Sequence, residues 1–404
     1  MLRGCLVPVF RILWLAGLAW GLAAAPVRAA DEVDVTLTYL ARDEPPLEPL
    51  SLAEPTLTDA GLMGARQARD DNQTTGAFLG HQYELVERIV PEDGDLGAVF
   101  DEALAAGERL FIADLKKDDL LALAPKADAA GALVLNGRAE DDELRTSLCF
   151  ESVLHTAPSR AMKADALAQY LVWKRWTRWF LVHGSHPEDK ALAAAVARAA
   201  ERFGAKIVET REFEDTGGAR RTETGHVQVQ QQMPVFTQAA PEHDVLVVAD
   251  ESEVFGDYMP YRTWDAKPVV GTTGLVPTSW SRVHEQWAGT QMQHRFESFA
   301  GRPMTERDYN IWVGVRAIGE AVTRTQTADP AQLIDYILSP DFQLGIFKGQ
   351  GASFRGWNQQ LRQPILLVTP RTLVSVSPQE QFLHRRTPLD TLGYDEPESA
   401  CRLN

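Results

Sequence analysis

The chain of 404 residues carries 56 acidic and 40 basic side chains, which gives a formal net charge of −16. Such an excess of acid argues against non-specific nucleic-acid binding, because contacts to phosphate need clustered cations. The length exceeds that of one typical domain, so we expect two lobes.

Residues 1–29 have the pattern of a secretory signal peptide. Arg3 and Arg11 precede an apolar run over 13–25, and Val27-Arg28-Ala29 after it predict the cleavage site. The run is shorter than the roughly 18 apolar residues of a membrane span. We therefore expect a soluble mature chain in the periplasm.

Two cysteines, Cys149 and Cys401, follow this segment. In an oxidising compartment, two remaining cysteines favour a disulfide. Two free buried thiols are the alternative.

Strand and helix patterns alternate through the first third of the chain. Continuous apolar runs such as 109–115 are typical of strands buried on both faces of a parallel sheet. The repeated β-α-β order predicts a doubly wound α/β fold. The expected strands lie at 33–40, 81–90, 109–115 and 131–137, with helices at 57–72 and 94–107.

A second set of elements follows the irregular segment 136–159. We expect helices at 159–175, 187–204, 284–301, 305–325 and 330–339, a weaker helix at 224–238, strands at 179–184, 206–213, 244–252 and 267–274, and hairpin-like strands at 351–376. The two sets predict two lobes, each a mostly parallel sheet flanked by helices. The expected lobe 1 comprises 30–155 plus 267–345, lobe 2 comprises 156–266 plus 346–378, and 379–404 form a C-terminal tail.

The stretch YLVWKRWTRWFLVHG, which starts at Tyr170, interleaves aromatic and basic residues, as a nucleic-acid or anion site would. It also marks the end of a helix that runs into a buried strand. Trp173 falls on the apolar stripe of that helix, and Trp179 opens the strand. The pattern therefore favours core and junction roles over ligand stacking, with Trp173 expected in the core.

After the first strand the sequence predicts a helix of small residues, a turn with an acidic residue and an asparagine, and then a second strand. The residues that form this pattern are Gly61, Gly64, Ala65, Ala68, Asp71, Asn72, Gly80, Glu84 and Leu85. This pattern resembles that of type I periplasmic solute-binding proteins of the branched-chain amino acid kind, over about 33–378. The resemblance implies a two-lobed, non-enzymatic protein that closes on a small ligand and serves an ABC permease.

Three longer stretches are more specific: LHTAPSRAMKADALAQYL, GTTGLVPTSWSRVHEQWAG and RPMTERDYNIWVGVRAIGEA. They resemble a subfamily that accompanies pyrroloquinoline quinone (PQQ) dehydrogenase pathways. This implies PQQ, or a molecule metabolised with it, as the bound ligand, with no required cofactor and with a permease or a periplasmic quinoprotein dehydrogenase as partner. A cofactor chaperone and a sensor module are alternatives. The segment 41–59 is rich in proline and acid, which makes a simple amino acid ligand unexpected.

In a two-lobed α/β binder, the ligand lies between the lobes at the carboxyl ends of the strands. Arg160 starts a helix there and could hold a carboxylate, or it could be a solvated arginine. Trp280 could stack on a planar ring, or it could pack between the lobes. The predicted ligand-binding residues are Arg138, His155, Thr156, Ser159, Arg160, Asp250, Arg262, Trp264, Thr273, Gly274 and Trp280.

Signals of catalysis are weak. The segment HEQWA at 284–288 lacks the second histidine of a zinc-protease helix, and no GxSxG, P-loop or post-strand GxGxxG is present. The acidic run 140–143 reads as a solvated face rather than a cation site. We therefore expect no catalytic residues and no metal site.

Overall fold

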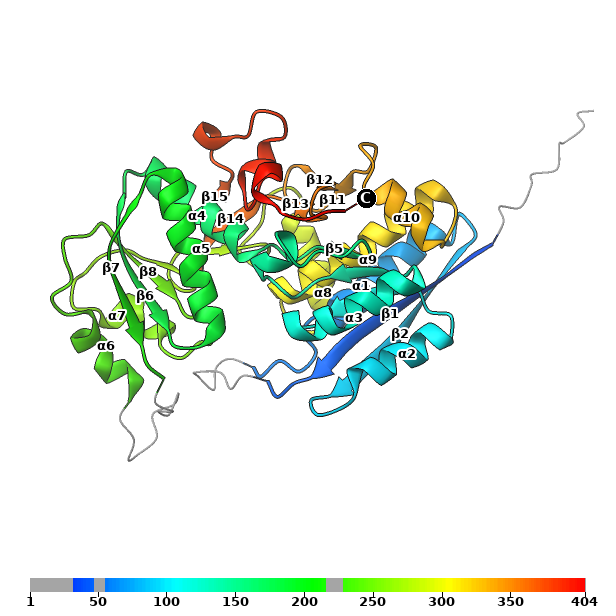
Figure 1. Cartoon of the computed structure of the whole chain (residues 1–404), viewed down its shortest axis with the longest axis horizontal. Helices are drawn as coiled ribbons and strands as arrows, with labels where there is room; N and C mark the ends of the chain where they lie inside the picture. The colour runs from blue at the N-terminus through cyan, green and yellow to red at the C-terminus, as the bar shows by residue number, and fades with distance from the viewer. Residues whose placement is uncertain (1–31, 47–54, 216–227, 404) are drawn as a thin grey trace, which may run out of the picture. The chain divides into compact units, whose positions relative to one another are not determined.

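The computed structural model describes residues 32–46, 55–215 and 228–403, so the predicted signal peptide lies outside the described residues. Two mostly parallel sheets flanked by helices confirm the predicted fold class (Figure 1). The sheet of lobe 1 has the strand order β2-β1-β3-β4-β5, and that of lobe 2 has the order β7-β6-β8-β9. Among the described residues, we find no helix with both the length and the apolar character needed to cross a membrane.

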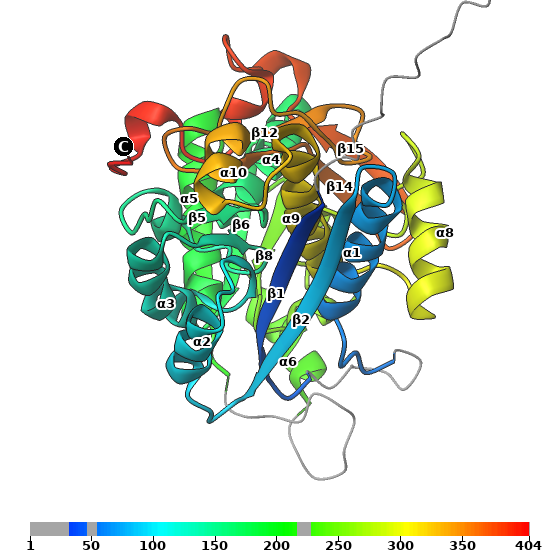
Figure 2. The same ribbon diagram turned by 90° about the vertical axis from the view of Figure 1, so that its right-hand side faces the viewer.

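Lobe 1 is built around five parallel strands. These are β1 (Val33–Asp43), β2 (His81–Pro91), β3 (Leu110–Asp114), β4 (Leu133–Asn136) and β5 (Val153–His155). Its helices are α1 (Leu62–Gly76), α2 (Leu96–Ala105), α3 (Lys117–Ala130), α8 (Gly289–Ala300), α9 (Glu306–Thr325) and α10 (Pro330–Ile337). Figure 2 shows α1 and α8 on one side of β1 and β2, with α2 and α3 on the other. Every residue of β3 and β4 is buried, as their continuous apolar sequences predict.

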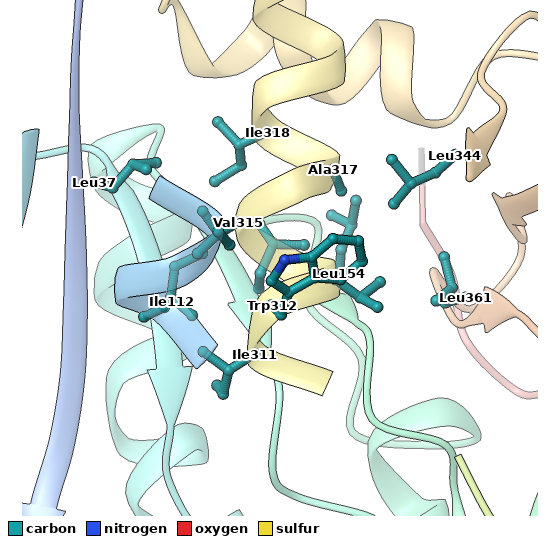
Figure 3. Packing of buried hydrophobic residues seen from close by; sticks show 14 of the residues in the cluster. Leu37, Ile112, Leu154, Ile311, Trp312, Val315, Ala317, Ile318, Leu344 and Leu361 are labelled. Carbon is teal, nitrogen blue, oxygen red and sulfur yellow. The ribbon is translucent and has the colours of Figure 1, made fainter. Parts of the chain in front are cut away.

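Helix α9 supplies much of the core of lobe 1, although it follows β5 by about 150 residues. Its Ile311 and Val315 pack against Leu37, Ile112 and Leu154 of the sheet, and all five side chains are at most 1% exposed (Figure 3). A helix that is apolar around most of its circumference belongs inside a domain. Lobe 1 is therefore completed by a segment from the C-terminal half of the chain.

Two glycines allow α1 and α9 to approach closely. A Cβ atom on Gly64 of α1 would lie 2.1 Å from the backbone oxygen of Asp308. A Cβ atom on Gly319 of α9 would lie 2.1 Å from Oδ1 of Asn72. The small residue at position 64 is thus explained by this helix contact.

Lobe 2 has four parallel strands, β6 (Arg178–Gly184), β7 (Lys206–Phe213), β8 (Val245–Ala249) and β9 (Val269–Gly271). Its helices are α4 (Arg160–Trp173), α5 (Pro187–Phe203), α6 (Val229–Thr237) and α7 (Met259–Arg262). Pro187 opens α5, and Gly204 ends it in the left-handed conformation at φ 81°. Both boundaries agree with the sequence prediction.

Two small antiparallel sheets accompany the lobes. One contains β10 (Val276–Thr278), β14 (Ile365–Thr369) and β15 (Thr372–Ser377), and the other contains β11 (Leu344–Gly345), β12 (Gly351–Phe354) and β13 (Leu361–Arg362). The first contributes Ile365 and Leu367 to the core of lobe 2, and the second contributes Phe354 and Leu361 to the core of lobe 1.

The division between the lobes differs from the sequence expectation in two places. β9 lies in the range 267–345 expected in lobe 1, but it pairs with β8 of lobe 2. The strands β12 and β13 lie in the range 346–378 expected in lobe 2, but they pack on lobe 1. The second placement depends on packing between segments that are distant in the sequence.

The predicted disulfide is present. Cys149, between β4 and β5, is bonded to Cys401 in the tail, with 5.6 Å between their Cα atoms and a sequence separation of 252. The tail also packs against lobe 2, where Leu392 is fully buried in the core.

The tryptophan-rich stretch divides between core and surface. Trp179 is 1% exposed, which confirms its prediction as the start of a buried strand. The expectation of a core position for Trp173 is wrong, because this residue ends α4 and is 45% exposed. The Nζ atom of Lys174 lies 4.2 Å from the Trp173 ring centroid, so a cation–π contact accompanies the exposed ring.

Candidate functional site

A cavity of about 1740 Å³ is lined by residues of both lobes. Its walls are the segments that follow β1, β3, β4, β6 and β8, together with the first turns of α4, α5 and α9. Ligand sites of open α/β folds lie at the carboxyl ends of the strands. The cavity is therefore the candidate site, and it occupies the position that the sequence predicted.

Arg160, the first residue of α4, is held between carboxylates of the two lobes. Its Nε and Nη2 atoms donate to Glu251, which follows β8 of lobe 2, at 2.8–3.0 Å. Its Nη1 atom donates to Asp141, which follows β4 of lobe 1, at 2.8 Å. Burial alone would lower the pKa of Arg160, but Glu251 and its acidic neighbours raise it. The guanidinium is therefore permanently charged and already paired.

Lys163 lies one turn further along α4 and makes a second bridge. Its Nζ atom donates to Glu140 at 2.6 Å and to Glu306, at the start of α9, at 3.0 Å. Burial raises the pKa of Glu140 to about 7, and the charges of Glu306 and Glu251 add to this effect while Lys163 opposes it. Glu140 thus differs from the solvated side chain that the acidic run indicated.

The wall from lobe 1 holds a third group of paired charges. Arg307 donates to both oxygens of Asp114 at 2.6 and 2.9 Å, and the hydroxyl of Tyr39 donates to the same carboxylate at 2.6 Å. Burial, followed by the charge of Asp114, raises the pKa of Tyr39. At the rim, Arg138 donates to Glu44 at 2.7 Å.

Among the described residues that line the cavity, carboxylates outnumber lysine and arginine side chains by thirteen to seven. Each of the seven lysine and arginine side chains forms an ion pair with a carboxylate. An excess of one sign of charge in a cleft focuses the electrostatic field there. The cavity therefore attracts cations. The basic lining residues are Arg42, Lys116, Lys117, Arg138, Arg160, Lys163 and Arg307.

Three of the predicted ligand-binding residues, Arg138, Arg160 and Asp250, line the cavity. The carboxylate of Asp250 accepts hydrogen bonds from the backbone N–H groups of Val254, Phe255 and Gly256 at 2.5–3.0 Å. Asp250 thus holds the backbone of the loop after β8 in place.

Three other predicted residues are buried at the crossing into lobe 2, outside the cavity lining. The Nδ1 atom of His155 lies 3.0 Å from the side-chain nitrogen of Asn136. Thr156 donates to the backbone oxygen of Asn310 at 2.9 Å. Ser159 accepts from the N–H of Met162 at 3.3 Å and caps α4, as its sequence position indicates.

The remaining five predicted residues also lie outside the cavity lining. Arg262 and Trp264 are exposed on lobe 2, and Trp264 is 58% exposed. Thr273 and Gly274 form the turn after β9, where the neighbouring residues 271–272 line the cavity instead.

Trp280 lies in the core of lobe 1. It is 2% exposed, and its ring stacks on Tyr309 with 4.7 Å between ring centroids. Its Nε1 atom donates to Gln293 of α8 at 3.3 Å. The segment after β10 turns inward onto α9, and this turn directs the ring away from the cavity.

Sequence reasoning missed Lys163, Glu251 and Glu306 of the charge network. Lys163 follows Arg160 by three residues, and this spacing places both on one helix face, so their proximity could have been found. No local signal marks Glu251 or Glu306, because their partners come from distant segments. Within the ranges that the structure describes, no group of three or more His, Cys, Asp or Glu side chains could hold a metal ion.

Comparison with known proteins gives a family match and several similar folds. Residues 56–220 match the model of the family described as periplasmic binding protein. No match was found among curated protein sequences. A branched chain amino acid ABC transporter periplasmic ligand-binding protein from Burkholderia xenovorans is 14% identical, with a TM-score of 0.68 over 86% of this chain and 96% of that one.

Two further solved structures are similar at comparable levels. An ABC transporter substrate-binding protein from Sphaerobacter thermophilus is 14% identical, with a TM-score of 0.70 over 89% of this chain and 100% of that one. An ABC transporter substrate-binding protein from Desulfitobacterium hafniense, in complex with Leu, is 16% identical, with a TM-score of 0.65 over 86% and 100%. At these identities the likeness concerns the fold, which is that of two-lobed type I periplasmic binding proteins.

Proposed function

We propose that this chain, whose residues 56–220 belong to the periplasmic binding protein family, is a solute-binding protein that holds a small ligand between its two lobes. The cavity at the carboxyl ends of the strands of both sheets carries this proposal. Such a cleft closes when one ligand contacts both of its walls. The walls here carry polar side chains from both lobes, which a closing ligand requires.

We propose a periplasmic location for the protein, with the membrane permease of an ABC importer as its partner. The similar structures from Burkholderia xenovorans, Sphaerobacter thermophilus and Desulfitobacterium hafniense are described as ABC transporter binding proteins. Such a protein does not transform its ligand. A non-enzymatic role is therefore part of the proposal.

The charge of the cavity supports a ligand with an ammonium or another cationic group. Among the described lining residues there are thirteen carboxylates and seven lysine or arginine side chains, and each of those seven is paired. A cationic solute gains attraction from the unbalanced carboxylates without displacing an ion pair. Amino acids carry an ammonium group, and the Desulfitobacterium hafniense protein was solved in complex with Leu.

PQQ is the second candidate ligand, because three stretches of the sequence resemble proteins of PQQ-dependent pathways. Its three carboxylates need cations, so Arg138 and Arg160 would have to exchange protein carboxylates for those of the ligand. Each exchange forfeits an existing charged hydrogen bond. This cost makes PQQ the less favoured candidate, together with delivery to a quinoprotein dehydrogenase.

Calorimetric titration of refolded, ligand-stripped protein tests the proposal with free L-arginine, free L-leucine and PQQ. We expect binding of the cationic amino acid, a rise in melting temperature, and weaker binding as salt is added. Binding of PQQ alone would reject the cationic ligand. No binding of any of the three, with no solute released when the purified protein is denatured, would contradict a solute-binding function.

Two matched variants locate the site. Glu188 lines the cavity at the start of α5, whereas Glu212 pairs with Lys190 outside the lining and is 45% exposed. We expect Glu188→Gln to weaken binding of a cationic solute by roughly fivefold, which corresponds to about 1 kcal/mol. Glu212→Gln should leave binding unchanged.

A further inference from the structure

The C-terminal segment 388–401, called here the strap, first contacts the part of the chain that packs on lobe 1. Oδ1 of Asp390 accepts from Nε of Arg355 at 2.9 Å and from Nε of Arg362 at 2.8 Å. Arg355 directly follows β12 and Arg362 lies in β13, and the hairpin of these two strands carries Phe354 and Leu361 into the core of lobe 1. Asp390 and Arg355 are 3% and 1% exposed, so the anchor is buried.

The strap next contacts lobe 2. The N–H of Gly393 donates to Oδ2 of Asp165 in α4 at 2.8 Å, and its carbonyl accepts from Arg202 of α5 at 2.5 Å. Leu392 lies in the core of lobe 2. Further along, Glu398 pairs with Arg198 of α5 at 3.1 Å. The middle of the strap is therefore fixed to the two helices that cover one face of the lobe 2 sheet (Figure 1).

The end of the strap returns to lobe 1. The hydroxyl of Ser399 donates to the backbone oxygen of Arg145 at 3.0 Å, and the N–H of Ala400 donates to the backbone oxygen of Thr146 at 2.8 Å. The disulfide then joins Cys401 to Cys149, between β4 and β5. The strap thus contacts lobe 1, lobe 2 and lobe 1 again within 14 residues.

We propose that the strap limits the relative movement of the lobes and that the disulfide keeps it in place. This inference takes from the proposed function only the premise that the two lobes move relative to each other. Any separation of the lobes pulls on segments anchored to both of them, and the covalent bond prevents the last anchor from detaching. Reduction leaves that anchor with two hydrogen bonds to backbone oxygens, which open far more readily. The range of lobe opening therefore depends on the redox state of one cysteine pair.

Small-angle X-ray scattering and hydrogen exchange on the unliganded chain test this inference. We compare the oxidised protein, the folded protein after addition of a reductant, and a Cys149→Ser/Cys401→Ser variant. Reduction is expected to broaden the distribution of interlobe distances and to accelerate amide exchange in 145–160 and in the strap by about tenfold. If the double variant does not fold, the comparison of oxidised and reduced wild-type protein tests the inference.

A third perturbation cuts the other anchor and keeps the disulfide. Asp390→Ala removes the bonds to both arginines and should also broaden the distance distribution, whereas Arg386→Ala, at an exposed position before the strap, should not. Faster exchange confined to the strap, with unchanged interlobe distances in reduced protein and in Asp390→Ala, would overturn the inference. No ligand is used, so failure here is distinct from a failure of the solute-binding proposal.

Discussion

Replacing Glu140 with glutamine should change how the stability of the protein depends on pH. The folded protein holds a proton on Glu140 up to a pH of about 7, whereas the unfolded chain releases it near the ordinary value of 4.5. Folding therefore takes up a proton between these values. The contribution of Glu140 to stability is fully present below about pH 4.5 and is lost as the pH rises through about 7.

The structure sets the size of the effect. A pKa rise from 4.5 to about 7 corresponds to about 3 kcal/mol, because each pKa unit is worth about 1.4 kcal/mol. The side chain of Glu140 is 20% exposed, so water screens part of this free-energy difference. We expect an effect of about 1–3 kcal/mol on the free energy of unfolding. Glutamine cannot ionise, and Lys163 keeps Glu306 as its partner in the variant. The stability advantage of the variant should therefore be small near pH 5 and approach this amount near pH 8.

Urea unfolding at about pH 5 and about pH 8 measures the difference. Asp165, whose pKa burial raises to about 6, contributes equally to both proteins and cancels. The matched control is Glu143→Gln, because Glu143 pairs with Lys117 but is 57% exposed. A difference between wild type and Glu140→Gln that is the same at both pH values, or that the control reproduces, would refute the argument.

Two other changes test the packing. Trp179→Ala should lower the free energy of unfolding by about 3–5 kcal/mol as a core truncation. Trp173→Ala, at the exposed end of α4, should lower it by less than about 1 kcal/mol. Equal losses for the two variants in chemical denaturation would show that Trp173 is part of the core. Gly64→Ala should cost about 1–3 kcal/mol by forcing α1 away from α9, while Gly345→Ala, whose Cβ meets nothing within 4 Å, should shift the melting temperature little. A Gly64→Ala protein that melts with the wild type would show that the helices separate without cost.

Local patterns were sufficient to predict the fold class and most of the elements, but α3 was not predicted and β5 lies in a segment expected to be irregular. The apolar runs at 109–115 and 179–184 became buried parallel strands, and the proline and glycine that bound α5 marked its ends. These features depend on neighbours within a few residues. The disulfide followed from counting cysteines in an oxidising compartment.

The features that could not be predicted depend on contacts between distant segments. The stripe position of Trp173 indicated burial, but the residue ends α4 and is 45% exposed. Trp280 follows a strand, as a cleft residue would, but its ring stacks on Tyr309 of α9 and lies in the core. The ion pairs of Lys163 join α4 to residues 23 positions before it and 143 after it. Only the assembled fold brings such groups together, so the sequence indicated the place of the cavity but few of its residues.

The late position of α9 also imposes an order on folding. Strands β1 to β5 end at residue 155, but the helix that covers one face of their sheet begins at residue 306. A chain that emerges with its N-terminus first therefore presents an apolar sheet face that α9 does not cover until about 150 more residues have followed. Lobe 2 obtains most of its sheet from one continuous stretch before α9 appears. We therefore expect the formation of lobe 1 to be the slower step, because a loop of about 150 residues has to close before α9 contacts the sheet. The sheet face that is exposed until then is the surface that we expect a chaperone to shield.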